Sequence, residues 1–141
     1  MIYTLTVTAV FGAYLKEECV RILDIDESAT LEDLHLAIQR AVSFDNDHLY
    51  EFYAGRHYRD RRIRYGDAED WEARESVFSE LRLSAVYPLT GLKLYYWFDF
   101  GDDWIFEIRK SRNVKPAEAG VSYPRVVESR GPNPTQYPSW E

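Results

Sequence analysis

The chain has 141 residues, of which 45% are hydrophobic and 16% aromatic, and its formal net charge is -7. This length predicts one domain over residues 1–141 with a single core. The acidic balance argues against unspecific attraction to nucleic acid, because such binding normally requires a basic face. Cys19 is the only cysteine, which excludes an internal disulfide and a paired-cysteine zinc motif and favours a reducing, cytoplasmic setting.

The first third of the chain predicts two strands followed by a helix. Apolar residues alternate with threonines over residues 2–10, which is the period-two pattern of a strand. Residues 18–25 alternate again and carry apolar residues on both faces, as expected inside a sheet. Thr30 and the acidic residues after it favour a helix start, and apolar residues then recur at helical steps to about Ser43. The amino-terminal pattern lacks a basic leader and a long apolar core, so we expect no membrane contact.

The rest of the chain predicts further strands and an extended tail. Residues 48–54 are rich in aromatic side chains and predict a third strand, whereas residues 56–75 form a charged insertion without a regular pattern. A short helix is expected over 76–83, and two paired strands over 92–100 and 104–110. Residues 113–141 hold five prolines among apolar residues, which favours a strap lying on the domain.

Together these elements predict an α+β fold. We expect a single mixed β-sheet with one main helix packed across it, β-grasp-like, plus an extended Pro-rich C-terminal strap.

Three carboxylates meet at the predicted turn between the last two strands. Asp99, Asp102 and Asp103 are candidate oxygen ligands for a divalent cation such as magnesium or calcium. The alternative is structural: Gly101 and Asp102 would form a two-residue hairpin turn, with glycine at positive φ and aspartates capping free amides. The pattern favours the structural interpretation.

The charged insertion contains the strongest binding signal in the chain. The segment RHYRDRRIRY, residues 56–65, supplies the candidate binding residues Arg56, Tyr58, Arg59, Arg61, Arg62 and Arg64. Arginine forks bind phosphates and tyrosine rings stack on bases. The alternative is a self-neutralising loop, because five acids follow at once: Asp67, Glu69, Asp70, Glu72 and Glu75.

The histidines show no metal-binding spacing. His35 lies beside the apolar stripe of the predicted helix, His48 opens a predicted strand and His57 lies in the basic insertion. A structural or surface role is therefore expected for each of them.

Several motifs together resemble a known family. TLEDLHLAIQ at 30–39, HLYEF at 48–52 and YYWFDFGDDWIFEI at 95–108 are similar, in order and spacing, to the plasmid pRiA4b ORF-3-like family. The tail YPRVVESRGPNPTQYP at 123–138 resembles the proline-rich end of its members. The resemblance implies a prokaryotic α+β protein found on plasmids and in insertion elements, and it implies no established activity. Many members resemble a pattern with histidine where this chain has Phe106, so any role of that histidine is absent here.

These observations lead to competing functional hypotheses. The first is a non-catalytic binding or accessory protein of the mobile-element family, without a cofactor and with an unknown protein or nucleic-acid partner. The alternative is a metal-assisted hydrolase or nuclease in which Asp99, Asp102 and Asp103 hold a divalent cation. A third is self-association through a sheet edge, giving a homo-oligomer.

Overall fold

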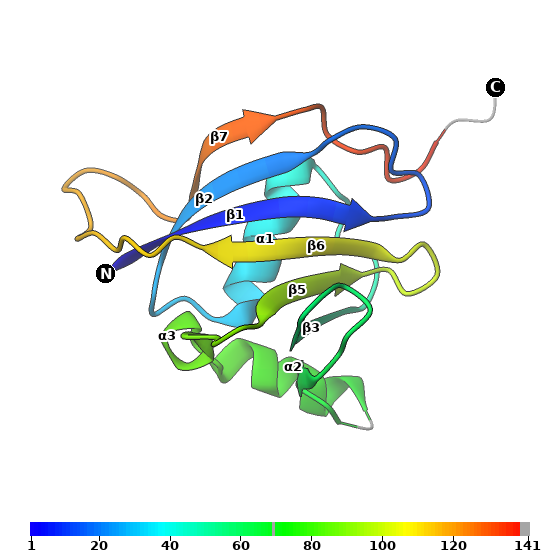
Figure 1. The fold of residues 1–141 in the computed structure, drawn as a ribbon, viewed down its shortest axis with the longest axis horizontal. Coiled ribbons are helices and arrows are strands. Elements are labelled where there is room, and N and C mark those ends of the chain that lie inside the picture. Colours follow the sequence, from blue (N-terminus) through cyan, green and yellow to red (C-terminus); the bar gives the residue numbers. More distant parts are fainter. Residues whose placement is uncertain (69, 139–141) are drawn as a thin grey trace.

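The computed structural model describes residues 1–68 and 70–138. Within these residues the chain forms seven strands and three helices (Figure 1). The strands are β1 (Ile2–Phe11), β2 (Val20–Asp26), β3 (Tyr50–Gly55), β4 (Ile63–Tyr65), β5 (Lys93–Phe98), β6 (Trp104–Lys110) and β7 (Arg125–Arg130). The helices are α1 (Leu31–Val42), α2 (Trp71–Glu80) and α3 (Leu83–Val86). Glu69 of the acidic segment and residues 139–141 of the tail lie outside the described residues.

The described strands form one sheet in the order β4-β3-β5-β6-β1-β2-β7, and every neighbouring pair is antiparallel. The prediction of a mixed, β-grasp-like sheet was therefore wrong. The prediction of one main helix was also wrong, because α2 has 10 residues beside the 12 of α1, and α3 adds a third short helix. In β1, for example, Val7 lies opposite Arg21 on one side and Ile108 on the other, both in antiparallel strands. Alternation of apolar residues decides which face a residue occupies, but it is compatible with either strand direction.

The carboxyl-terminal segment joins the sheet, so the prediction of a proline-rich strap was also wrong. Strand β7 pairs with β2, and Val20 lies opposite Arg130. Pro124 and Pro132 flank the strand, where a proline removes no hydrogen bond of the ladder. All six residues of β7 are exposed, so backbone pairing holds this edge strand without a buried apolar face that a sequence pattern could reveal.

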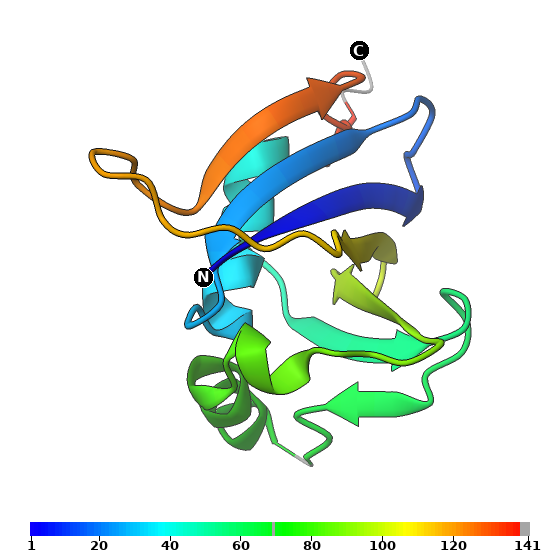
Figure 2. The same cartoon turned by 60° about the vertical axis from the view of Figure 1, so that its left-hand side comes forward.

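Helix α1 covers one face of the sheet (Figures 1 and 2). Its predicted start is confirmed: the Thr30 hydroxyl accepts from the Asp33 N–H at 3.2 Å, and the Asp33 carboxylate accepts from the Thr30 N–H at 2.9 Å. Leu34 and Ile38 of the predicted apolar stripe are fully buried. In the part of the chain that the structure describes, no helix has the length and apolar character needed to cross a membrane.

The charged insertion is more ordered than its composition indicated. It contains β4, which pairs with β3, and the beginning of α2. The Asp70 carboxylate accepts from the Ala73 N–H at 2.8 Å and so caps α2. The helix begins at Trp71, five residues before the start predicted from the sequence. Phe78 is the buried residue of α2, and its ring stacks on Tyr50 with the centroids 5.0 Å apart. The exposed charged residues before it gave no sign that the helix begins at Trp71.

The two faces of the sheet are packed differently. The face toward α1 carries the main core, which includes Leu5, Leu23 and Phe106. The opposite face carries a smaller cluster built on Tyr53, Tyr95 and Ile105. Because successive residues of a strand point to opposite faces, β3 and β6 each contribute to both clusters.

Candidate functional site

The arginine-rich insertion folds over the sheet face opposite α1. The Arg61 guanidinium lies 3.9 Å from the ring centroid of Trp97 and 5.4 Å from that of Tyr53. The Tyr53 hydroxyl donates a hydrogen bond to the Tyr58 carbonyl at 2.5 Å. A cation over an aromatic ring is attracted by the electrons of the ring face, so these contacts tie the insertion to the sheet.

Gly55 and Asp60 determine how tightly this loop closes. A Cβ atom on Gly55 would lie 1.8 Å from the Asp60 carbonyl oxygen, so no larger residue fits there without a shift of the backbone. The Asp60 carboxylate accepts from the Arg56 N–H at 2.9 Å and lies 3.8 Å from the Arg62 guanidinium. The side chains of Arg56 and Arg62 remain exposed at the loop surface.

Several of these residues line a hollow of about 210 Å³. Its lining residues are Phe11, Tyr58, Arg59, Arg61, Asp103 and Ile105; together with Trp97 they form what we call the arginine–aromatic surface. The rings of Phe11 and Tyr58 stack with their centroids 5.6 Å apart, and Arg59 Nε donates to the Tyr58 hydroxyl at 3.2 Å. The structure therefore brings Tyr58, Arg59 and Arg61 of the predicted binding set together.

Arg64 has a different role from the other predicted arginines. It forms a two-pronged ion pair with buried Glu51, with Nε–Oε1 and Nη2–Oε2 distances of 2.6 and 3.1 Å. It also lies 3.8 Å from Asp67, and among the described residues this pair is the single ion pair between the five arginines and the acidic segment 67–75. Arg64 thus braces β3 against β4, and the described residues of segment 67–75 form no ion pair with the other four arginines.

The acidic turn between β5 and β6 spans residues 99–103, so the predicted two-residue glycine turn was wrong. Asp99 and Asp103 take the left-handed conformation, with φ of 58° and 53°, whereas Gly101 does not. Asp99 Oδ1 accepts from the N–H groups of Gly101 and Asp102 at 3.2 and 3.3 Å. This local hydrogen bonding explains why aspartate tolerates a conformation that usually favours glycine.

The three aspartates of the turn point to different partners. Asp103 Oδ1 accepts from the indole N–H of Trp97 at 2.9 Å, and both residues belong to the arginine–aromatic surface. Asp99 Oδ2 lies 3.3 Å from His48 Nε2. Burial, followed by the charge of Asp99, raises the pKa of Asp102. Across residues 1–68 and 70–138 no three His, Cys, Asp or Glu side chains are arranged to hold a metal ion, and the metal site stays a prediction.

His48 connects this turn to the tail. Its Nε2 atom lies 2.7 Å from the Tyr137 hydroxyl, which itself donates to the Asp47 carboxylate at 2.7 Å. Gln136 also donates to Asp47, at 3.0 Å. These contacts anchor the end of the described tail beside the start of β3.

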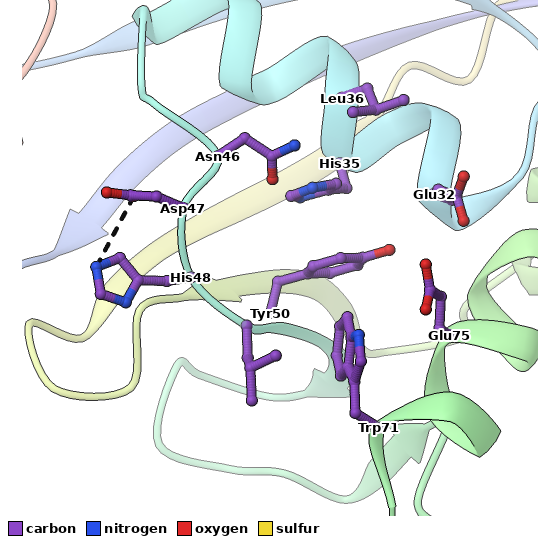
Figure 3. Close-up of a pocket in the computed structure, with 10 residues that line it drawn as sticks. Glu32, His35, Leu36, Asn46, Asp47, His48, Tyr50, Trp71 and Glu75 are labelled. Atoms are coloured by element: carbon purple, nitrogen blue, oxygen red, sulfur yellow. Dashed lines mark ion pairs between the residues drawn. The ribbon is translucent and has the colours of Figure 1, made fainter.

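A pocket of about 580 Å³ opens between α1, α2 and the start of β3 (Figure 3). We call it the acidic–aromatic pocket, and its lining residues are Glu32, His35, Leu36, Asn46, Asp47, His48, Leu49, Tyr50, Trp71 and Glu75. Glu32 of α1 and Glu75 of α2 lie on one side of it, near the Tyr50 hydroxyl, as Figure 3 shows. The sequence did not predict this site, because its residues come from segments far apart in the chain. The nearest signal was an acid, Glu32, in the first turn of a helix followed by His35 on the same helix.

His35 is buried within a network of hydrogen bonds, and its burial favours the neutral form. Gln39 uses its carbonyl oxygen to accept from the Asn46 N–H and its amide to donate to the Tyr96 hydroxyl, both at 2.9 Å. The fully buried Tyr96 hydroxyl accepts from Gln39 and can donate its own hydrogen to His35 Nδ1. A hydrogen bond with the Asn46 side chain acts in the opposite direction to burial, since it raises the pKa of His35. Burial lowers the pKa of His35 to about 4. The neutral imidazole stacks on Tyr50 with ring centroids 3.7 Å apart.

The fold and these sites define a class: an antiparallel-sheet domain with short helices and charged aromatic surfaces, in which the described residues show no metal cluster. Residues 3–136 match the model of the plasmid pRiA4b ORF-3-like protein family, and the chain belongs to that family. The resemblance seen in its motifs is thereby confirmed.

Two relatives show how far this family likeness extends. The chain is 32% identical over 108 residues to the uncharacterized protein y4hQ of Sinorhizobium fredii (strain NBRC 101917 / NGR234). The matched residues cover 75% of this chain and 52% of that protein. It thus spans about half the length of this curated relative. The crystal structure of MM3350, a protein of unknown function from Methanosarcina mazei Go1, is similar with a TM-score of 0.72 and 26% identity. That likeness covers 94% of this chain and 70% of the solved one, and neither relative's name states a ligand.

Proposed function

We propose that the protein is a non-catalytic binding protein and that the arginine–aromatic surface binds a phosphate-bearing partner, namely single-stranded nucleic acid. The observation that carries this proposal is the Arg61 guanidinium held over the Trp97 ring at 3.9 Å. Arginine presents several donors in a planar fork that suits phosphate, and the stacked ring orients this fork before any partner arrives.

The surroundings of Arg61 support this proposal. The Asp103 carboxylate accepts a hydrogen bond from the Trp97 indole and fixes the ring, so less side-chain freedom is lost on binding. Phe11 and Tyr58 form a partly exposed ring pair beside it, on which a splayed base can stack. Arg56 and Arg62 are exposed in the same loop and add positive charge, although the Arg62 guanidinium lies 3.8 Å from the Asp60 carboxylate.

The net charge of -7 means that the protein as a whole does not attract a polyanion. Long-range attraction of a polyanion is weak for such a chain, so binding has to come from short-range contacts. Affinity should then fall steeply as salt rises, since each neutralised phosphate of a single strand releases condensed counterions.

The test uses fluorescence anisotropy of a labelled single-stranded oligonucleotide at several salt concentrations. Replacing Arg61 and Arg62 together by alanine should weaken binding at least about tenfold and lower the salt slope by roughly 1.4, at about 0.7 per phosphate contact. The double variant Arg40→Ala/Arg112→Ala is the matched control, since both residues are exposed and lie outside the surface. Equal binding by both double variants would sink the proposal. Binding of an acidic polypeptide but not of the oligonucleotide would assign the surface to a protein partner.

A metal-assisted hydrolase or nuclease at the acidic turn is the second candidate. The observation in its favour is that burial, followed by the charge of Asp99, raises the pKa of Asp102, and a divalent cation would relieve the repulsion between the two carboxylates. Magnesium, manganese or calcium should then raise the melting temperature of the protein, and Asp102→Asn should abolish the rise. A melting temperature that no cation changes would remove this candidate.

A further inference from the structure

The acidic–aromatic pocket holds negative charge without a matching positive charge. Glu32 and Glu75 face it from two different helices, and within the described residues neither carboxylate forms an ion pair. None of the ten lining residues is a lysine or an arginine. His35, the most buried base in the lining, is neutral for the reason given above. Two neighbouring carboxylates repel each other, so a cation between them would be stabilised.

The hydroxyl group of a largely buried tyrosine points into the same space. Tyr50 is only 4% exposed, and its ring is held between His35 and Phe78, with centroid distances of 3.7 and 5.0 Å. Its hydroxyl lies toward Glu32 and Glu75 (Figure 3) and has no hydrogen-bond partner in residues 1–68 and 70–138. Burial, with smaller effects of the two glutamates, raises the pKa of Tyr50 and keeps the hydroxyl neutral. A rigid, neutral hydroxyl oxygen between two carboxylates is a ready acceptor for N–H donors.

The remaining walls suit the apolar part of a ligand. The rings of Tyr50 and Trp71 meet edge to face at 5.3 Å, and Leu36 and Leu49 add aliphatic side chains. The rest of the lining is polar and consists of Asn46, Asp47 and His48. Aromatic faces attract ammonium and guanidinium groups and also pack against methylene groups. The volume of about 580 Å³ lies within the range of small-molecule sites.

We propose that the acidic–aromatic pocket binds an organic cation, an ammonium or guanidinium group on a short apolar stem. The cationic head lies between Glu32 and Glu75 and donates to the Tyr50 hydroxyl oxygen, while the stem packs on Trp71. A free amine and the basic side chain of a peptide share this chemistry. The site lies on the opposite side of the sheet from the arginine–aromatic surface, so the two can be tested independently.

The experiment titrates the full chain with agmatine and n-butylamine by isothermal titration calorimetry. Saturable binding is expected for both, and 1-butanol, which has the same stem without the charge, should not bind. Capped tripeptides with a central arginine or lysine form the second arm. Tighter binding of the peptides than of the free amines assigns the source to a protein side chain, and the reverse order assigns it to a small amine.

Matched variants connect the binding to this pocket. Glu32→Gln/Glu75→Gln should weaken agmatine binding at least about tenfold, because it removes both charge-assisted hydrogen bonds. Glu72→Gln/Glu80→Gln changes the net charge equally at exposed positions of α2 and should leave the affinity unchanged. Tyr50→Phe keeps the packing, guarding against simple misfolding, and should weaken binding roughly threefold to tenfold.

Three results would overturn the inference. They are the absence of saturable binding by every amine and peptide, equal affinities in the two glutamine double variants, and displacement of agmatine by calcium or magnesium at lower concentration. Oligonucleotide binding should be the same in Glu32→Gln/Glu75→Gln as in the unmodified chain, so failure of this inference is distinguishable from failure of the proposed function.

Discussion

Two regions on opposite sides of β3 combine aromatic rings with charges of opposite sign. On the outer side, Arg61 rests on Trp97 and Tyr53, so its charge already has partners within the protein. On the inner side, Glu32 and Glu75 face a pocket whose described lining offers them no cation. The comparison shows that the binding potential of a charged cluster depends on which partners within the protein its charges already have. In the two proposals above, the outer surface binds an anion through an arginine that is already oriented by aromatic rings, whereas the inner pocket binds a cation between carboxylates that have no ion-pair partner among the described residues.

The largest expected effect comes from removing Phe78, which supports the acidic–aromatic pocket but not the arginine–aromatic surface. Phe78 is fully buried and stacks on Tyr50, so Phe78→Ala should destabilise the fold by roughly 3–5 kcal/mol. Urea denaturation measures this loss, and Val77→Ala, a partly exposed neighbour on α2, should change stability by less than about 1 kcal/mol. At temperatures where the variant stays folded, it should lose agmatine binding and keep oligonucleotide binding. Parallel loss of both would mean that the two regions are not independent.

A smaller effect is expected in the pH dependence of stability, because the inner region contains a neutral buried base, His35. The pKa of His35 is about 4 in the folded chain and near 6.5 when unfolded, so the unfolded state binds the proton more readily. This contribution to stability is complete above pH 6.5 and is lost as pH falls toward 4, by about 3 kcal/mol at 1.36 kcal/mol per pKa unit. Denaturation series between pH 4 and 7 should therefore show a flatter profile for His35→Gln. An identical slope in both proteins would contradict the neutral assignment.

The smallest expected effect concerns the outer region and the turn beneath it. Asp103 has φ of 53°, which glycine adopts without strain, so Asp103→Gly removes the acceptor for the Trp97 indole and leaves the backbone intact. We expect a stability change of about 1 kcal/mol and a shift in tryptophan fluorescence. Asp103→Asn keeps an acceptor oxygen and is the control. If oligonucleotide binding survives Asp103→Gly unchanged, the orientation of Trp97 does not matter for the outer surface.

Local features of the fold could be predicted from the sequence because they depend on neighbouring residues. The start of α1 after Thr30 follows from the capping residues. The limits of β6 follow from the alternation of residues within the strand. The start of α2 was missed because its apolar stripe is reduced to Phe78, and β7 was missed because it buries no side chain. For the candidate sites, the sequence identified Arg61 and the acidic turn, but it gave no sign that Asp103 supports the same surface.

The sequence by itself determined the family, the strand and helix periods, and the presence of an arginine-rich insertion. Only the tertiary structure decided that all neighbouring strands run antiparallel and that the tail closes one edge of the sheet. It alone brought Glu32, Tyr50 and Glu75 around one pocket. The physical reason is the sequence separation of the interacting residues. Capping and periodicity depend on residues close together in the chain, whereas strand partners and pockets depend on which distant segments bury the most surface together.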